Sequence, residues 1–248
     1  MAGMSPVYSA LVAALRDLRE PRVLALGLLP PLAAIALWLG LAWAFADDWA
    51  RLVAGWIADT PWLGWVRDWG WSPVLIWAGG IAALMLLLPA MLVAALLVTD
   101  LVAMPVIVPL VGGRHYPRLE RREGGSVAGS AWNAAVAVAV FTGLWLATLP
   151  LWFTGIGALL LPPLLSAYFN QRMFRYDALA EHASAEEQER VIGASRGELF
   201  LLGLAVSLLL YVPFVNLLVP VLSALAFTHF CLARLARVRA AGQDHKMA

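Results

Sequence analysis

Four long stretches of the chain contain no Asp, Glu, Lys or Arg residue: Val23–Ala46, Trp69–Thr99, Gly124–Gln171 and Leu199–Ala233. A helix that crosses the hydrocarbon core of a bilayer needs about 20 apolar residues, so each stretch is long enough to enter a membrane. No large hydrophilic region is left between them for a soluble domain. The pattern predicts an all-α integral membrane protein that forms a single membrane domain, residues 1–248.

Basic residues flank the third and the fourth stretch at both ends. The third stretch lies between Arg122 and Arg172, and the fourth lies between Arg196 and Arg234. Short loops rich in arginine stay on the cytoplasmic side of a membrane. Each of these two stretches is therefore expected to leave and to return on the same side, as a helical hairpin.

Both of these stretches contain helix-breaking residues in their interior. A straight helix over the 35 residues of the fourth stretch would be about 52 Å long, but the hydrocarbon core is only about 30 Å thick. Pro213 lacks an amide hydrogen and ends a first leg, and Asn216 can cap a second leg. We therefore predict a re-entrant hairpin with legs of about 16 residues and its turn inside the bilayer. The third stretch is broken at "PLWFTGIG", residues 150–157.

The sequence divides the membrane domain into segments with distinct roles. They are an amphipathic interfacial helix at 5–20, a transmembrane helix at 23–46, a Trp-rich outer loop at 47–72, a second transmembrane helix at 73–99, a basic loop at 112–125, a helical hairpin at 126–171, a cytoplasmic surface helix at 184–196 and the re-entrant hairpin at 199–233. Ser5 and Pro6 favour a helix start. Ser184 and Glu187 have the spacing of a capping box, and the charges of that helix are expected to be solvated.

The distribution of charge predicts the orientation of the chain. Residues 47–68 carry two arginines against four aspartates, whereas the other fifteen basic residues lie outside this segment. Nine of the twelve tryptophans fall between Trp38 and Trp77, as in an aromatic belt. The positive-inside rule then places this segment outside and both termini in the cytoplasm.

Composition argues against several other functions. Apolar residues make up 62% of the chain and charged residues 13%, and the net charge of +1 gives no reason to expect a nucleic-acid partner. Lys246 is the only lysine and no phosphate-binding GxxxxGK loop occurs, so ATP-driven chemistry is not expected. The four histidines lack metal-ligand spacing, and no catalytic set stands out. We predict no metal, no cofactor and no enzymatic activity.

The breaks in the hairpins suggest one kind of binding site. The second legs would begin near Gly155, Gly157 and Asn216, where unpaired N–H groups and the helix dipole favour an anion. Paired broken helices are a sequence indication of a transport site. The alternative is that proline and glycine only form turns, and the residues alone leave both open.

Several segments resemble one family in order along the chain. "EPRVLALGLLPPLAAIALW" (20–38), "MPVIVPL" (104–110), "FTGIGALLLPPLLSAYFNQRMFRYDAL" (153–179) and "GELFLLGLAVSLLLYVPFVNLLVPVLSALAFTH" (197–229) are similar to segments of the CysZ-type sulfate permeases and the wider etoposide-induced-protein family. Arg22 stands alone where the sulfate permeases carry paired arginines, and Leu24 and Ala25 fill the matching places.

The resemblance implies two full spans, two partly penetrating hairpins, and a homo-oligomer in the bacterial inner membrane. It also implies passive uptake of sulfate or a similar oxyanion for sulfur assimilation and cysteine biosynthesis. Arg22 would attract the anion, and the helix ends near Gly155, Gly157 and Asn216 would line its path. The alternative is a membrane scaffold or lipid-interacting protein of the same family that transports nothing.

Overall fold

The structure is a computed structural model that describes residues 5–29, 97–98, 101–213 and 215–247, together with isolated positions between residues 32 and 93. Over these residues every regular element is helical, which confirms the predicted all-α class for this part of the chain. The predicted span at 23–46 is described continuously only to residue 29. The Trp-rich loop at 47–72 lies outside the described residues, and so does the span at 73–99 apart from isolated positions.

The described helices run in sequence from the N-terminus to the C-terminus. They are α1 (Pro6–Asp17), a short helix at 21–29, the helix Leu101–His115, α5 (Val127–Trp152), α6 (Ile156–Ala180), α7 (Ala185–Ala194), α8 (Arg196–Leu208), the 3-10 turns η2 (Leu209–Tyr211) and η3 (Val215–Leu218), and α9 (Val219–Met247).

Two of the described helices are long and apolar enough to cross a membrane. They are Val127–Trp152, which is α5, and Val215–Gln243, which joins η3 to most of α9. In the most apolar part of α9, 72% of the residues are buried, against 17% in α5. Helix α9 therefore lies at the centre of the helices around it, and α5 lies at the edge with most of its apolar surface uncovered.

Helix α1 forms where its sequence signals place it. The Ser5 hydroxyl accepts a hydrogen bond from the Tyr8 amide at 3.3 Å, and a proline occupies the first turn. The buried side of α1 consists of Ala10, Ala14 and Asp17, and α1 packs against α9. The larger side chains of Leu15 and Tyr8 remain exposed, while the small buried residues allow the close contact with α9.

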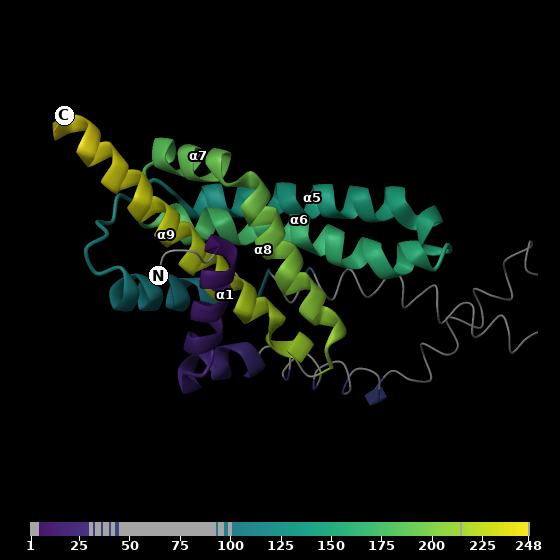
Figure 1. Cartoon of the computed structure of the whole chain (residues 1–248). Helices are drawn as coiled ribbons and strands as arrows, with labels where there is room; N and C mark the ends of the chain where they lie inside the picture. Colours follow the sequence, from purple (N-terminus) through teal and green to yellow (C-terminus); the bar gives the residue numbers. More distant parts are fainter. Residues whose placement is uncertain are drawn as a thin grey trace, which may run out of the picture. The chain divides into compact units, whose positions relative to one another are not determined.

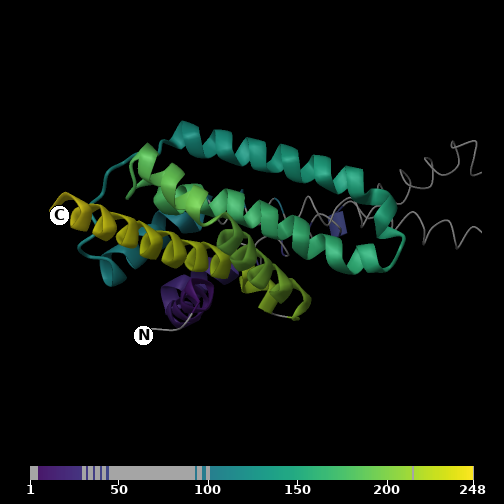
Figure 2. The same cartoon turned by 45° about the horizontal axis from the view of Figure 1, so that its top comes forward.

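Helices α5 and α6 form an antiparallel pair, which Figures 1 and 2 show side by side from two directions. The Ser126 hydroxyl caps the start of α5, and Phe153–Gly155 form the turn at the break that the sequence predicts. Gly155 has φ +67°, a left-handed conformation that glycine adopts without steric cost. The helical hairpin is therefore observed, while its turning inside a bilayer remains a prediction.

Backbone hydrogen bonds from residues 122–125 cover the other end of this hairpin, at the C-terminus of α6. The Arg122 and Glu123 amides both donate to the Glu181 carbonyl, and the Gly124 amide donates to Ala183, each at 3.0–3.1 Å. The Gly125 amide donates to the Ala180 carbonyl at 3.0 Å. Carbonyls at a helix C-terminus have no partner within the helix. The loop before α5 therefore supplies the cap for the end of α6.

The last hairpin differs from its prediction in the length of its second leg. Helix α8 ends at Leu208 and η2 ends at Tyr211, and Val212 is extended before Pro213, as steric crowding ahead of a proline requires. Helix α9 then continues to Met247, well beyond the predicted end at Ala233. Asn216 lies inside η3 rather than at the cap position assigned to it. The re-entrant path of this hairpin remains a prediction.

Helices α6 and α8 approach each other closely at one point. A Cβ atom added at Gly203 of α8 would lie 2.6 Å from the Ala167 carbonyl oxygen of α6. One turn further along, the Asn170 side-chain amide donates to the Ser207 hydroxyl at 3.2 Å, and both residues are buried. Small residues that allow close backbone contact, with a polar bond beside them, are typical of packed membrane helices.

We predict that Gly203→Ala destabilises the protein, because the added methyl group forces α6 and α8 apart at a cost of about 1–3 kcal/mol. The measurement is thermal unfolding in detergent. The matched control is Gly143→Ala in α5, where an added Cβ meets nothing within 4 Å. That control should unfold at the wild-type temperature or slightly above it. Equal midpoints for the two variants would contradict the close contact.

Candidate functional site

The turns of the two hairpins are joined by a side-chain hydrogen bond. The Tyr211 hydroxyl in η2 donates to the Leu159 carbonyl in the first turn of α6, at 2.5 Å. The two residues are 52 positions apart in the sequence. The start of α6 and the turn before α9 are therefore neighbours. We call this region, residues 153–159 together with 209–213 and 215–218, the hairpin tips.

The start of α6 is a tight turn that uses glycine for two reasons. Gly155 requires its positive φ, and a side chain on Gly157 would overlap the Leu151 carbonyl. The Gly157 amide already donates to the Thr154 hydroxyl at 3.0 Å. Sequence reasoning missed Thr154, although it precedes Gly157 at the three-residue spacing of a capping side chain. The Gly157 amide is therefore engaged within the turn.

The structure groups three of the four predicted site residues and separates the fourth. Gly155 and Gly157 lie at the hairpin tips. Asn216 lies there too, and its backbone N–H donates to the Val212 carbonyl at 3.1 Å. Arg22 is exposed at the start of the helix at 21–29. On that helix it is Gly27 that faces the tips, since an added Cβ there would lie 3.1 Å from Leu218. Five residues of helix, about 7.5 Å, separate Arg22 from this contact.

The first turns of the helices at the tips are free of acidic residues. Neither α6 nor α9 has an Asp or Glu in its first turn, whereas α7 and α8 begin with glutamates. The positive end of the helix dipole is therefore not neutralised by a local carboxylate at either tip helix. The surrounding surface is apolar: Phe153 is 83% exposed and Ile156 is 71% exposed.

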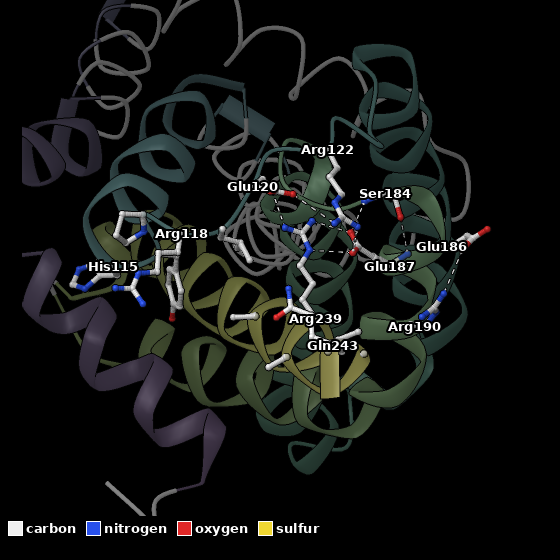
Figure 3. A pocket seen from close by; sticks show the side chains of 17 residues that line it. His115, Arg118, Glu120, Arg122, Ser184, Glu186, Glu187, Arg190, Arg239 and Gln243 are labelled. Atoms are coloured by element: carbon white, nitrogen blue, oxygen red, sulfur yellow. Dashed lines mark hydrogen bonds and ion pairs between the residues drawn. The ribbon is translucent and has the colours of Figure 1, made fainter. Parts of the chain in front are cut away.

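A polar pocket of about 880 Å³ lies between the 115–122 loop, the start of α7 and the end of α9. Four arginines and three glutamates line it, namely Arg118, Arg122, Arg190, Arg239, Glu120, Glu186 and Glu187. Figure 3 shows Arg122 and Arg239 converging on Glu187, while Arg190 pairs with Glu186 at the rim. Among the described residues Arg118 has no ion-pair partner, so the pocket offers one uncommitted guanidinium group to an anion.

Glu187 is the central charge of this pocket. Its carboxylate accepts from Arg239 at 2.9 and 3.0 Å and from Arg122 at 2.8 Å, and Glu187 itself is buried. The hydrogen bond from Arg239 is the main reason that the pKa of Glu187 lies below its usual value. The capping box with Ser184 is present, as predicted. The expectation that the charges of this helix are solvated is wrong for Glu187, because Arg239 approaches from α9.

Asp17, His115 and His229 form a cluster that sequence reasoning did not find. The Nε2 atoms of His115 and His229 lie 3.0 and 2.9 Å from the same Asp17 oxygen, Oδ2. The pairs are 98 and 212 residues apart, so no local spacing could indicate them. The only available signals were an acidic residue at the end of an amphipathic helix and a histidine within an apolar run.

Over the described residues, these features define an all-helical protein with two helices that are long and apolar enough to cross a membrane. The chain matches the family described as sulfate transporter CysZ/etoposide-induced protein 2.4 over residues 10–220. The match covers most of the chain, and the protein therefore belongs to this family. The family is of transporter type, which agrees with the resemblance found in the sequence. No curated protein and no solved structure matches the chain.

We predict that Glu187→Gln lowers the stability of the protein by about 1–3 kcal/mol, because two arginines lose their counter-charge while the capping side chain is kept. The measurement is unfolding in detergent at neutral pH. The exposed Glu189→Gln change on the same helix is the control and should have little effect.

The same variant tests the sign of the pH dependence. A carboxyl group with a lowered pKa stabilises the folded state above its unfolded pKa, and this contribution is lost as pH falls through the folded value. The wild type should therefore lose part of its stability below about pH 4.5, the ordinary value for Glu. The Glu187→Gln variant should not lose this part of its stability at low pH, because glutamine does not titrate. Parallel pH curves for the two proteins would contradict the assignment.

Proposed function

We propose that the protein is a passive permease or channel for sulfate, or a similar oxyanion, that supplies sulfur assimilation and cysteine biosynthesis without ATP hydrolysis. The observation that carries this proposal is membership of the family, because sulfate is the substrate that the family's description names. The proposed location is the bacterial inner membrane, with both termini in the cytoplasm.

The arrangement of the hairpin tips supports this proposal. Two broken hairpins meet through Tyr211 and Leu159, and the helices that begin there carry no acidic residue in their first turns. Paired half-helix ends are a common way to bind an anionic group at membrane depth. In this proposal the backbone near Gly155, Gly157 and Asn216 lines the anion path. Tyr211 holds the two tips together.

The arginines have a different role in the proposal. A dianion is costly to remove from water, so attraction must begin where cationic side chains are exposed. Arg22 is exposed at the start of its helix, and Arg118 lines the polar pocket. Both would concentrate sulfate at the water-facing surface, and the hairpin tips would act on it further along.

A homo-oligomer is part of the same proposal. The tips expose large apolar side chains, and Leu146 and Leu151 of α5 are each 51% exposed. Extensive exposed apolar surface is typical of contact with lipid or with another copy of the chain. A path shared between copies would bring more than one set of helix ends to the anion.

The second candidate is a membrane scaffold or lipid-interacting protein that transports nothing. The same exposed tip residues favour it, since Phe153 and Ile156 would serve equally well to anchor the chain in lipid or against a partner. The two candidates differ in whether the purified protein moves an anion across a membrane.

The deciding experiment is uptake of radiolabelled sulfate by liposomes that contain the purified protein. We expect uptake above that of empty vesicles, with an uncharged labelled sugar excluded by both. Arg22→Ala should reduce the initial rate roughly 10-fold at low salt and less at high salt, because electrostatic attraction is screened. The control Arg16→Ala removes an exposed arginine from α1 and should leave uptake unchanged. Uptake equal to empty vesicles would leave the scaffold as the function.

We predict that Tyr211→Phe lowers sulfate uptake several-fold while changing the free energy of unfolding by no more than about 1.5 kcal/mol, because it removes one hydrogen bond. The measurements are uptake in liposomes and unfolding in detergent on the same preparations. Tyr8→Phe, which alters an exposed tyrosine of α1, is the control. Unchanged uptake by Tyr211→Phe would show that joining the tips has no role in transport.

A further inference from the structure

The cluster of Asp17, His115 and His229 brings together three separate parts of the chain. Asp17 is the last residue of α1, His115 ends the helix Leu101–His115, and His229 lies in α9. None of the three belongs to the hairpin tips. The cluster is therefore separate from the residues that carry the proposed transport function.

The geometry of the cluster is that of a ligand set. Potential ligand atoms from all three residues lie within 4.8 Å of one another. The two imidazole rings are 5.0 Å apart at an angle of 66°, so both present Nε2 to one carboxylate without stacking. In a tetrahedral site with bonds of about 2.0–2.2 Å, neighbouring ligand atoms are about 3.3–3.5 Å apart. The present N–O separations of 2.9–3.3 Å need to widen by only a few tenths of an ångström.

We propose that Asp17, His115 and His229 bind a divalent transition-metal ion, and that Zn²⁺ is the ion that fits them best. Two imidazole nitrogens and one carboxylate are a common zinc ligand set, with a water molecule in the fourth position. Imidazole ligands disfavour Mg²⁺ and Ca²⁺, which prefer oxygen. Binding uses the lone pair of each Nε2 atom, so each neutral ring carries its proton on Nδ1 in the metal-bound form.

Burial and access both suit an exchangeable ion. The side chains of His229 and Asp17 are 3% and 8% exposed, whereas that of His115 is 38% exposed. His115 also lines the 880 Å³ polar pocket, through which an ion and its water molecule can enter. The Tyr116 hydroxyl donates to the His229 carbonyl at 3.2 Å and fixes that turn of α9. The ion would connect α1 to α9.

The competing role for the cluster is a hydrogen-bonded link without metal. In that case both rings donate from Nε2–H to Asp17, and the three side chains only hold α1 against α9. The two roles make different predictions for an ion added to the protein. A hydrogen-bonded link gains nothing from Zn²⁺, whereas a metal site is stabilised in proportion to the logarithm of the ion concentration.

The test uses the full chain in detergent, stripped with a chelator and titrated with Zn²⁺ alone. We expect one tightly held Zn²⁺ per chain by calorimetry and by elemental analysis after desalting. The thermal midpoint should rise with Zn²⁺ and fall back on chelation. Co²⁺ should produce the intense visible absorption of a tetrahedral site.

Variants separate this site from adventitious binding. His229→Ala and Asp17→Asn should weaken Zn²⁺ binding by more than the roughly 10–100-fold that loss of an outer-sphere partner costs. His182→Ala, a histidine outside the cluster, should bind as the wild type does. Asp17→Asn keeps the shape of the side chain and one acceptor oxygen, so its fold can be checked by metal-free unfolding. No stoichiometric Zn²⁺ in the wild type, or equal affinity in His229→Ala, would overturn the proposal and leave the hydrogen-bonded link.

Discussion

The described structure depends on one constraint, which is that α9 is buried among other helices, so most of the polar groups that it carries must find partners. Ser223 and Thr228 donate to carbonyls one turn back, at 2.8 and 2.7 Å. His229 pairs with Asp17 of α1, and Arg239 pairs with Glu187 of α7. An unpaired polar group in such a setting would cost several kcal/mol. These pairings therefore determine where α1 and α7 can sit.

The two ends of the hairpins differ in character. The tips carry helix ends and exposed apolar side chains, while the far end carries the arginines and glutamates that line the polar pocket. Helix α6 connects the two, since it begins at Ile156 and ends at Ala180, where the backbone of residues 122–125 caps it. Between them the bond from Asn170 to Ser207 is buried among apolar residues.

Much of the fold could be predicted from the sequence, because the signals were local. The turn at 153–155 follows from glycine, the end of the α8 segment follows from Pro213, and the capping box of α7 follows from the spacing of Ser184 and Glu187. The cluster at Asp17 and the pairing of Glu187 with Arg239 could not be found this way, since they join residues that only the packing of α9 brings together. The length of α9 was underestimated for a related reason. Charged residues beyond Ala233 indicated an exit from the bilayer, but a helix continues readily into water when its residues favour helix.

The pairing of Asp17 with His229 also has a consequence for biosynthesis. The ribosome makes α1 first and His229 more than two hundred residues later. Until α9 has emerged, the carboxylate of Asp17 can meet His115 but not His229. Helix α1 can therefore reach its final position only after α9 has been synthesised.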